Sequence, residues 1–172
     1  MGKRITILTK KGAIIMKSRL GEILYYTIQI VNQFPYMPQE LLANGGLEIG
    51  ISNSRKTSLS LKPTDSAFHS TICRSWNFYY GFDLIYQCAC ITNDDRLNAI
   101  DFLSSLTHWL VGNSTYNSIH VKKLLPITFN GGLLDRFIFN NDATLLSREA
   151  NGIELFSSGV KSVSTLVFDD YD

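Results

Sequence analysis

The sequence predicts an α+β fold in which two principal amphipathic helices pack on one face of a mainly antiparallel sheet. Two stretches, at about 18–33 and 95–111, carry apolar residues at three- and four-residue spacing, which is typical of helices with one buried side. The segments between and after them are rich in β-branched and aromatic residues and are separated by turn residues, as strands are. The order helix, strands, helix, strands indicates separate helical and sheet layers.

The 172 residues are expected to form a single domain over 16–172, preceded by a basic extension over 1–15 that is less integrated than the rest and can be disordered. The first nineteen residues hold six Lys and Arg and no acid, whereas the remaining 153 hold ten basic and fifteen acidic residues, about −5 in net charge. A body of this charge is a poor general binder of nucleic acid, because phosphate contacts need a basic face.

No apolar run approaches the roughly 18 residues that a membrane-spanning helix needs. The chain has three cysteines, an odd number, without the spacing of a secreted disulfide framework. We therefore expect reduced thiols in a cytoplasm and no contact with a membrane.

The first helix is predicted to begin after Ser18, which can cap it, and to end near Gln33 because Pro35 and Pro38 prevent its continuation. Strands are then expected at 47–52, 57–61 and 68–79, with a break at 63–65. Gly81 is interpreted as the turn of a hairpin that leads into a central strand.

The central strand and the second helix form the strongest unit, Phe82–Gly112. Apolar residues occupy most positions on both faces of the strand over 82–91, as in a strand covered on both sides. Asn93 or Asp94 is expected to cap the helix and Gly112 to end it. Its apolar stripe comprises Leu97, Ile100, Leu103, Leu106, Trp109 and Leu110.

After this helix, a strand is expected within 121–130, followed by a segment at 133–139 that fits either a strand or a helical turn. Further short strands are predicted at 144–148, 153–156 and 162–168. Asn151-Gly152 is a strong hairpin signal, because both residues tolerate the positive φ angles of a tight turn.

Four residues suggest a metal site: His69, Cys73, Cys88 and Cys90. Three thiolates and one imidazole could hold zinc tetrahedrally if a hairpin brought them together. The spacing, H-x3-C followed by C-x-C, is not that of the usual C-x2–4-C pairs, and free cysteine is often a small buried hydrophobe. Core cysteines are therefore the preferred interpretation, and zinc is the alternative.

The other candidates for chemistry also have structural explanations. Asp94 and Asp95 could hold a cation, but helix capping accounts for both. His108 suits the negative end of a helix, and Trp109 continues the core stripe. The sequence contains no G-x-S-x-G motif and no phosphate-binding loop. We predict no catalytic residues and no cofactor, and enzymatic activity is disfavoured.

Several stretches resemble small neck proteins of tailed phages that are described as minor capsid or tail terminator proteins. They are SRLGEILYYTIQIVNQ, WNFYYGFDLIYQCACITN and above all NDDRLNAIDFLSSLTHWLVG. In that family a polar turn leads into a helix of the form N-x-x-A-x-x-F-x-x-x-L-x-x-W-L. Here the pattern falls on Asp95 or Asn98 and on Ala99, Phe102, Leu106, Trp109 and Leu110. The later PITFNGG, Asp142–Leu146 and ANGIELFSSGVKSVSTLVF are also similar, so the likeness covers about 17–168.

The resemblance implies a structural protein of the virion, assembled in the cytoplasm of a bacterial host. Such a protein ends the tail tube and offers a docking face to the head connector. It would bind copies of itself in a hexameric ring through which DNA passes without specific binding. A head-completion protein of related fold is an alternative within the same class.

Two alternatives of other classes remain. One is an interaction domain stabilised by zinc at His69 and the three cysteines, which stoichiometric zinc in the purified protein would support. The other is a small-molecule-binding α+β domain or enzyme, for which a deep polar pocket would be the distinguishing feature.

Overall fold

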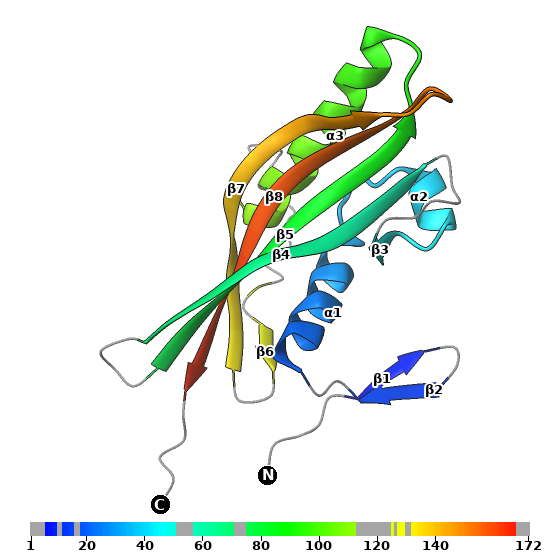
Figure 1. Cartoon of the computed structure of the whole chain (residues 1–172). Helices are drawn as coiled ribbons and strands as arrows, with labels where there is room; N and C mark the ends of the chain where they lie inside the picture. The colour runs from blue at the N-terminus through cyan, green and yellow to red at the C-terminus, as the bar shows by residue number, and fades with distance from the viewer. Residues whose placement is uncertain are drawn as a thin grey trace, which may run out of the picture.

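The computed structural model describes residues 6–9, 12–15, 18–50, 57–70, 75–112, 125, 127–129 and 132–167. These residues form an α+β fold with a curled, mixed but mostly antiparallel six-stranded sheet (Figure 1). The strand order is β3-β4-β5-β8-β7-β6. From β4 to β7 each strand is antiparallel to its neighbour, and β3 is parallel to β4. The strand bounds are β3 Leu47–Ile49, β4 Ser58–Ser70, β5 Ser75–Ala89, β6 Ile127–Phe129, β7 Gly132–Arg148 and β8 Ile153–Val167.

The four long strands are continuous where the sequence predicts interruptions. The expected break at 63–65 is instead a β-bulge inside β4, and the expected turn at Gly81 lies in the middle of β5. The undecided segment at 133–139 is a strand, and β7 runs through similar irregularities into the predicted strand at 144–148. The hairpin predicted around Gly81 is therefore wrong: β4 and β5 are joined through 71–74, outside the described residues. The Asn151-Gly152 hairpin is confirmed, with Gly152 at φ 80°.

Two glycines lie where side chains of a neighbouring bulge approach the central strands. A Cβ atom at Gly81 would collide with the side chains of Thr64 and Asp65 from the β4 bulge. A Cβ atom at Gly159 in β8 would collide with the side chain of Asn141 from the irregular part of β7. A larger residue at either position would therefore force these bulge side chains to move, and the bulges help to bend the sheet.

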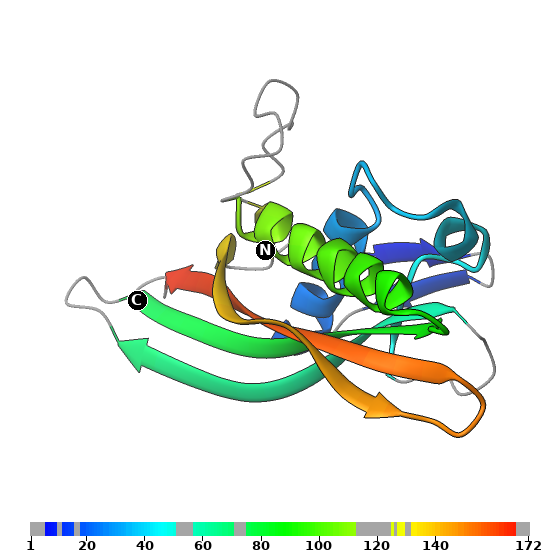
Figure 2. The same cartoon turned by 90° about the horizontal axis from the view of Figure 1, so that it is seen from above.

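Helix α3 (Asn93–Val111) lies across the concave face of the sheet (Figure 2). Its cap is Thr92 rather than Asn93 or Asp94, because the hydroxyl of Thr92 accepts from the N–H of Asp95 at 3.2 Å. The Asp95 carboxylate accepts in turn from the N–H of Thr92 at 2.8 Å, which completes a capping box. Gly112, with φ 80°, ends the helix as predicted.

The predicted stripe of α3 faces the core except at its first member. Leu103 and Leu106 are fully buried and Trp109 is 8% exposed, but Leu97 is 63% exposed. Leu97 belongs to the first helical turns, where α3 begins at the end of the sheet. The periodicity alone could not show which members of the stripe the rest of the fold covers.

Helix α1 (Arg19–Val31) begins after Ser18, whose hydroxyl accepts from the N–H of Gly21 at 3.1 Å. The cap prediction is therefore confirmed. The short helix α2 (Gln39–Ala43) follows Pro38, in a segment for which the sequence predicted no helix. Residues from α1, α2, α3 and the inward side of the sheet form one continuous hydrophobic core.

The N-terminal stretch contains a small hairpin of β1 (Thr6–Thr9) and β2 (Gly12–Ile15). These two strands pair with each other in a separate sheet and are not part of the six-stranded sheet. In the part of the chain that the structure describes, no helix is long and apolar enough to cross a lipid bilayer.

Candidate functional site

The outer edges of the six-stranded sheet are the first candidate for an interaction surface. On one side, β3 pairs only with Leu59–Leu61 of β4. On the other, β6 pairs only with Gly132–Leu134 of β7. No described strand pairs with the outer side of 62–70 in β4 or of 135–148 in β7. Both stretches therefore present backbone N–H and C=O groups that a strand of another chain could use.

Proline and charged residues mark these open edges. Pro63 lies in β4, where a missing backbone N–H is tolerated because the strand has a neighbour on only one side there. Asp65 forms an ion pair with Lys161 of β8 at 3.2 Å across Gly81. The hydrogen bond from Lys161 holds the pKa of Asp65 below its usual range, and this carboxylate is 62% exposed. Such features protect an edge strand from indiscriminate pairing with other strands.

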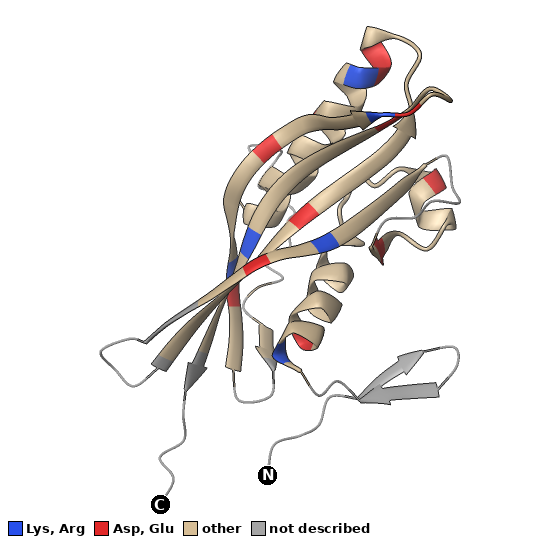
Figure 3. Cartoon of the chain, viewed as in Figure 1, with Lys and Arg blue, Asp and Glu red and all other residues tan. Residues whose placement is uncertain are grey.

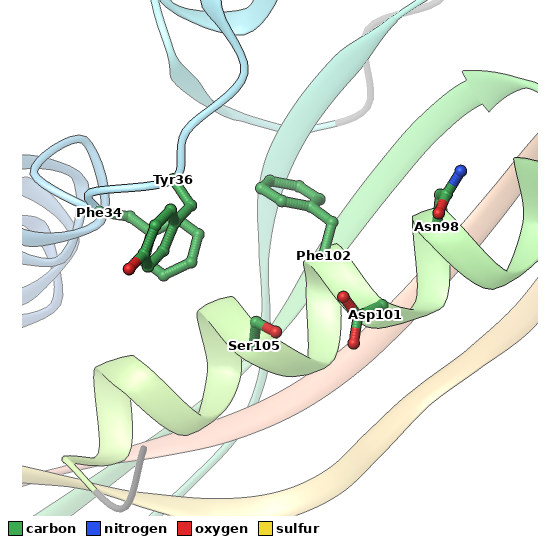
Figure 4. Close-up of a pocket in the computed structure, with 6 residues that line it drawn as sticks. All are labelled: Phe34, Tyr36, Asn98, Asp101, Phe102 and Ser105. Atoms are coloured by element: carbon green, nitrogen blue, oxygen red, sulfur yellow. The ribbon is translucent and has the colours of Figure 1, made fainter. Parts of the chain in front are cut away.

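A groove beside α3 is the second candidate surface (Figure 4). It has a volume of about 390 Å³ and lies between α3 and the segment that follows α1. The lining residues are Phe34, Tyr36, Asn98, Asp101, Phe102 and Ser105. The four on α3 recur at spacings of three, one and three residues, so they share one side of the helix.

The aromatic side of the groove is built by packing. The ring of Phe34 lies 5.8 Å from that of Tyr36, 6.2 Å from that of Phe102 and 5.4 Å from that of Trp109. Phe34 is buried, whereas Tyr36 is 60% exposed. Asp101 adds an exposed carboxylate that makes no hydrogen bond or ion pair with another described residue. The groove thus combines aromatic rings with one unneutralised negative charge.

Polar contacts fix the position of α3 on the sheet. The hydroxyl of Thr107 donates to the Leu103 carbonyl at 2.8 Å and lies 2.6 Å from the hydroxyl of Ser158 in β8. Ser104 donates to Asp142 of β7 at 2.7 Å. These contacts join the helix that forms the groove wall to two different strands.

We expect Thr107→Val to lower the free energy of unfolding by about 1–3 kcal/mol, because the buried Ser158 hydroxyl loses its partner. Ser158→Ala alone should lower the free energy of unfolding by less, because the Thr107 hydroxyl keeps its hydrogen bond to the Leu103 carbonyl. Urea unfolding of the single and double variants checks this. The double variant should be more stable than Thr107→Val alone, and additive losses would contradict the proposed coupling.

An ion-pair cluster holds the start of α3. Glu154 of β8 is 3% exposed and accepts from the Nε and Nη2 atoms of Arg96 at 2.8–3.0 Å. Arg148 of β7 lies 3.2 Å from the same carboxylate. The hydrogen bond from Arg96, aided by the charges of both arginines, holds the pKa of Glu154 below its ordinary value near 4.5. The cluster joins α3 to the two strands beneath its first turns.

The Glu154 cluster should make stability depend on acid pH. The folded state binds the Glu154 proton more weakly than the unfolded chain, so the ion pairs stabilise the fold above about pH 4.5. This stabilisation is lost as the pH falls through the lower pKa of the folded state. Glu154→Gln should lower the melting temperature at neutral pH. Below pH 4.5 the melting temperature of this variant should fall less steeply than that of the parent chain. Glu149→Gln, at an exposed residue of the adjacent turn, is the control and should follow the parent chain.

The structure places His69 and Cys88, two residues of the zinc alternative, far apart along the sheet. His69 pairs with Asn77 near one end of β5, whereas Cys88 lies eleven residues further along the same strand. At about 3.3 Å per residue this is roughly 36 Å. Cys73 lies outside the described residues. Among the described residues, no group of three or more His, Cys, Asp or Glu could hold a metal ion.

Cys88 and Cys90 lie on one side of the chain, with their Sγ atoms 3.5 Å apart and both residues buried. Burial raises the pKa of the Cys88 thiol to about 12, so this thiol is protonated at neutral pH. Both cysteines belong to the hydrophobic core, in agreement with the preferred interpretation of the sequence.

The remaining residues singled out in the sequence have structural roles. Asp95 completes the cap of α3, and Trp109 packs in the core against Phe34. His108 stacks on Phe139 of β7 with ring centroids 5.5 Å apart. Sequence reasoning missed the groove, because Phe34 and Asp101 are far apart in the chain and neither belongs to a motif.

Neither a protein-family model nor a curated protein matches this chain.

Proposed function

We propose that this protein is a structural virion-assembly protein of a tailed phage or prophage. In this role it ends the tail tube and joins it to the head connector as a ring of identical copies. The observation that carries the proposal is the pair of open strand edges, β4 beyond Leu61 and β7 beyond Leu134. The resemblance of 17–168 to tail terminator proteins supplies the biological setting.

The two edges suit a closed ring because they differ from each other. Pairing β4 of one copy with β7 of the next would be a head-to-tail contact, which repeats around a ring when the rotation between copies closes. β4 and β7 lie on opposite sides of the central pair β5 and β8, so one copy can have two neighbours at once. We propose six copies, as in the terminator rings that the sequence resembles.

We further propose that α1 and α3 share one face of the sheet and that the opposite face remains available to the tube or the connector. Three contacts support this layering. The Arg19 guanidinium lies 3.9 Å from the ring centroid of Phe78 in β5, and Phe34 packs on Trp109. Phe102 of α3 packs on Tyr86, which lies on the same side of β5 as Phe78.

The proposal includes no catalytic step, cofactor or metal ion. DNA would pass through the lumen without specific binding, because a body of about −5 net charge offers few cations to neutralise phosphates. Acidic side chains are spread over several strands and helices (Figure 3). Assembly would take place in the host cytoplasm and the final location would be the virion.

Tube elongation in vitro tests this function. The tail-tube protein of the same phage or prophage is polymerised with and without the present protein, and tube lengths are measured by negative-stain electron microscopy. We expect shorter tubes that carry a ring at one end. Tubes of unchanged length with bare ends, at a molar excess of the protein, would overturn the proposal.

A further inference from the structure

The two open edges of the sheet are covered at opposite ends (Figure 1). β3 covers β4 at the level of residues 84–86 of β5. β6 covers β7 at the level of residues 76–78 of β5. Between these two short strands, at the level of residues 79–83 of β5, neither edge has a partner among the described strands. We call this level the shared window.

Two rows of paired residues bound the shared window. One row crosses β5 at Tyr79 and the other crosses it at Asp83. The outermost residues of the rows are Ala67 and Arg136 in the first and Lys62 and Asn141 in the second. All four are exposed. The rows are four residues of β5, or about 13 Å, apart, and their side chains lie on the same face of the sheet because the side-chain period is two.

The symmetry of a ring brings the two sides of the window together. Copies in a closed ring are related by rotation. If the strands run along the ring axis, this rotation keeps every row at its level, so β7 of one copy meets β4 of the next within the window. The two strands are antiparallel there, as neighbours from β4 to β7 are. The irregular part of β7 after Asn141 lies where β7 must turn aside from β3 of the neighbouring copy.

The side chains at the window have complementary charges. Asp65 projects from the β4 bulge beside Gly81, in the middle of the window, and its carboxylate is 62% exposed. Arg136 of the adjoining copy would lie diagonally across from it on the same face, at a separation that a long side chain can span. The Arg136 side chain is 61% exposed.

Both charged groups can accept a further partner. The Arg136 guanidinium has five N–H donors, and its ion pair with the adjacent Asp135 uses the Nη1 atom. The Asp65 carboxylate has about four acceptor sites and already binds the ammonium group of Lys161. A second cation at this carboxylate would therefore add to the existing ion pair without replacing it.

We propose that residues 62–67 of β4 in one copy pair with residues 136–141 of β7 in the next as an antiparallel ladder, with Arg136 against Asp65 of the neighbouring copy. This inference rests on the proposed ring and adds to it the direction and register of the contact. Six residues of each strand make a short ladder. Ring closure compensates for this, because each copy is held on two sides at once.

Cysteine pairing between full-length chains tests the register. The four single variants are Lys62→Cys, Ala67→Cys, Arg136→Cys and Asn141→Cys. Each is made with Cys73→Ser, whereas Cys88 and Cys90 are buried and are kept. Directly opposite residues of an antiparallel pair lie about 4.5–5.5 Å apart, within the range that a disulfide spans. Variants are mixed two at a time, with and without tail tubes, and oxidised with a small-molecule disulfide. Linked dimers are then measured by non-reducing electrophoresis.

The same four variants supply the control. Ala67→Cys with Arg136→Cys and Lys62→Cys with Asn141→Cys are the matched pairs, and the second of them keeps both Asp65 and Arg136. Exchanging the partners gives two swapped pairs, whose cysteines would be about 13 Å apart. We expect at least about tenfold more linked dimer from the matched pairs, because a disulfide does not span the longer separation. All four positions are exposed, and an unchanged melting temperature of each variant confirms its fold.

The outcomes separate this contact from the proposed function. A parallel pairing of the edges would link the swapped pairs, and this result would overturn the inference. Equal linking of all pairs, or no linking although rings cap the tubes, would overturn the inference and leave the tail-terminating role intact. Neither links nor caps would overturn both. Matched links in a protein that never caps tubes would retain the contact and exclude the tail-terminating role.

Discussion

Trp109→Ala is expected to lower the free energy of unfolding by about 3–5 kcal/mol and to remove most of the soluble protein. Trp109 is 8% exposed and packs edge-on against Phe34 at 5.4 Å between ring centroids. Its loss leaves a cavity at the point where α3 contacts the segment after α1. Because the groove depends on Phe34, folded variant protein should also have an altered groove. Urea unfolding and the yield of soluble protein measure the effect.

Trp109→Phe is the matched control. The Nε1 atom of Trp109 is buried and has no hydrogen-bond partner among the described residues, so phenylalanine removes volume without breaking a polar contact. We expect a distinctly smaller loss than for alanine. Near-parental stability of Trp109→Ala would show that this side chain lies outside the core. Equal losses in both variants would point to an indole hydrogen bond.

Phe82→Ala is expected to have the second largest effect, again about 3–5 kcal/mol. Phe82 is 1% exposed on the inward side of β5, opposite Pro63 of β4 and Val160 of β8. It lies beside the β4 bulge where the sheet bends. The cavity would therefore loosen the bend as well as the core beneath the helices. Thermal and urea unfolding should both show the loss.

Phe139→Ala in β7 serves as the comparison for Phe82. Phe139 is 43% exposed and, within the described residues, its ring contacts only that of His108, so its truncation should cost about 0.5–1.5 kcal/mol. If both phenylalanine variants lost the same stability, the inward side of β5 would not be the centre of the core. That result would contradict the layering proposed for the helices and the sheet.

The long strands show what local patterns can and cannot predict. The α+β class with a mostly antiparallel sheet and the central position of the strand predicted at 82–91 could be predicted, because alternation and turn residues are local signals. Pro63 and Gly81 were interpreted as boundaries because these residue types usually end strands. In the structure they lie at or face bulges, where tertiary packing continues the strand through residues that locally favour a turn.

The helix ends were more predictable than the strands, since capping depends on neighbouring residues. Ser18 and Gly112 act as expected. Thr92 was missed as the cap of α3 because Asn93 and Asp94 are equally good capping residues by type. Thr92 is the cap because the Asp95 carboxylate accepts from the N–H groups of Ile91 and Thr92 and so holds this end of the helix in place.

The candidate surfaces are formed by residues that are far apart in the sequence, so local sequence patterns could not predict them. Asp101 and Phe34 meet only because α3 crosses the end of α1. Glu154 is paired with Arg96 over 58 positions of sequence. His69 and Cys88 of the zinc alternative are likewise separated by the length of β5, which their sequence pattern could not show.

The central claim is ring formation through the sheet edges. The most direct test is the mass of the assembly that the full chain forms, measured for the protein alone and in the presence of tail tubes. Sedimentation should give a concentration-dependent oligomer of one closed size. The variants Ser66→Pro and Ala67→Pro are compared with the parent chain. Successive N–H groups of a strand point to opposite sides, so one proline removes an N–H group from the open edge of β4 and the other removes one that faces β5. The variant that keeps the parental melting temperature should lose the oligomer. A chain that stays monomeric both alone and with tubes, or a full-size oligomer in both variants, would contradict the account.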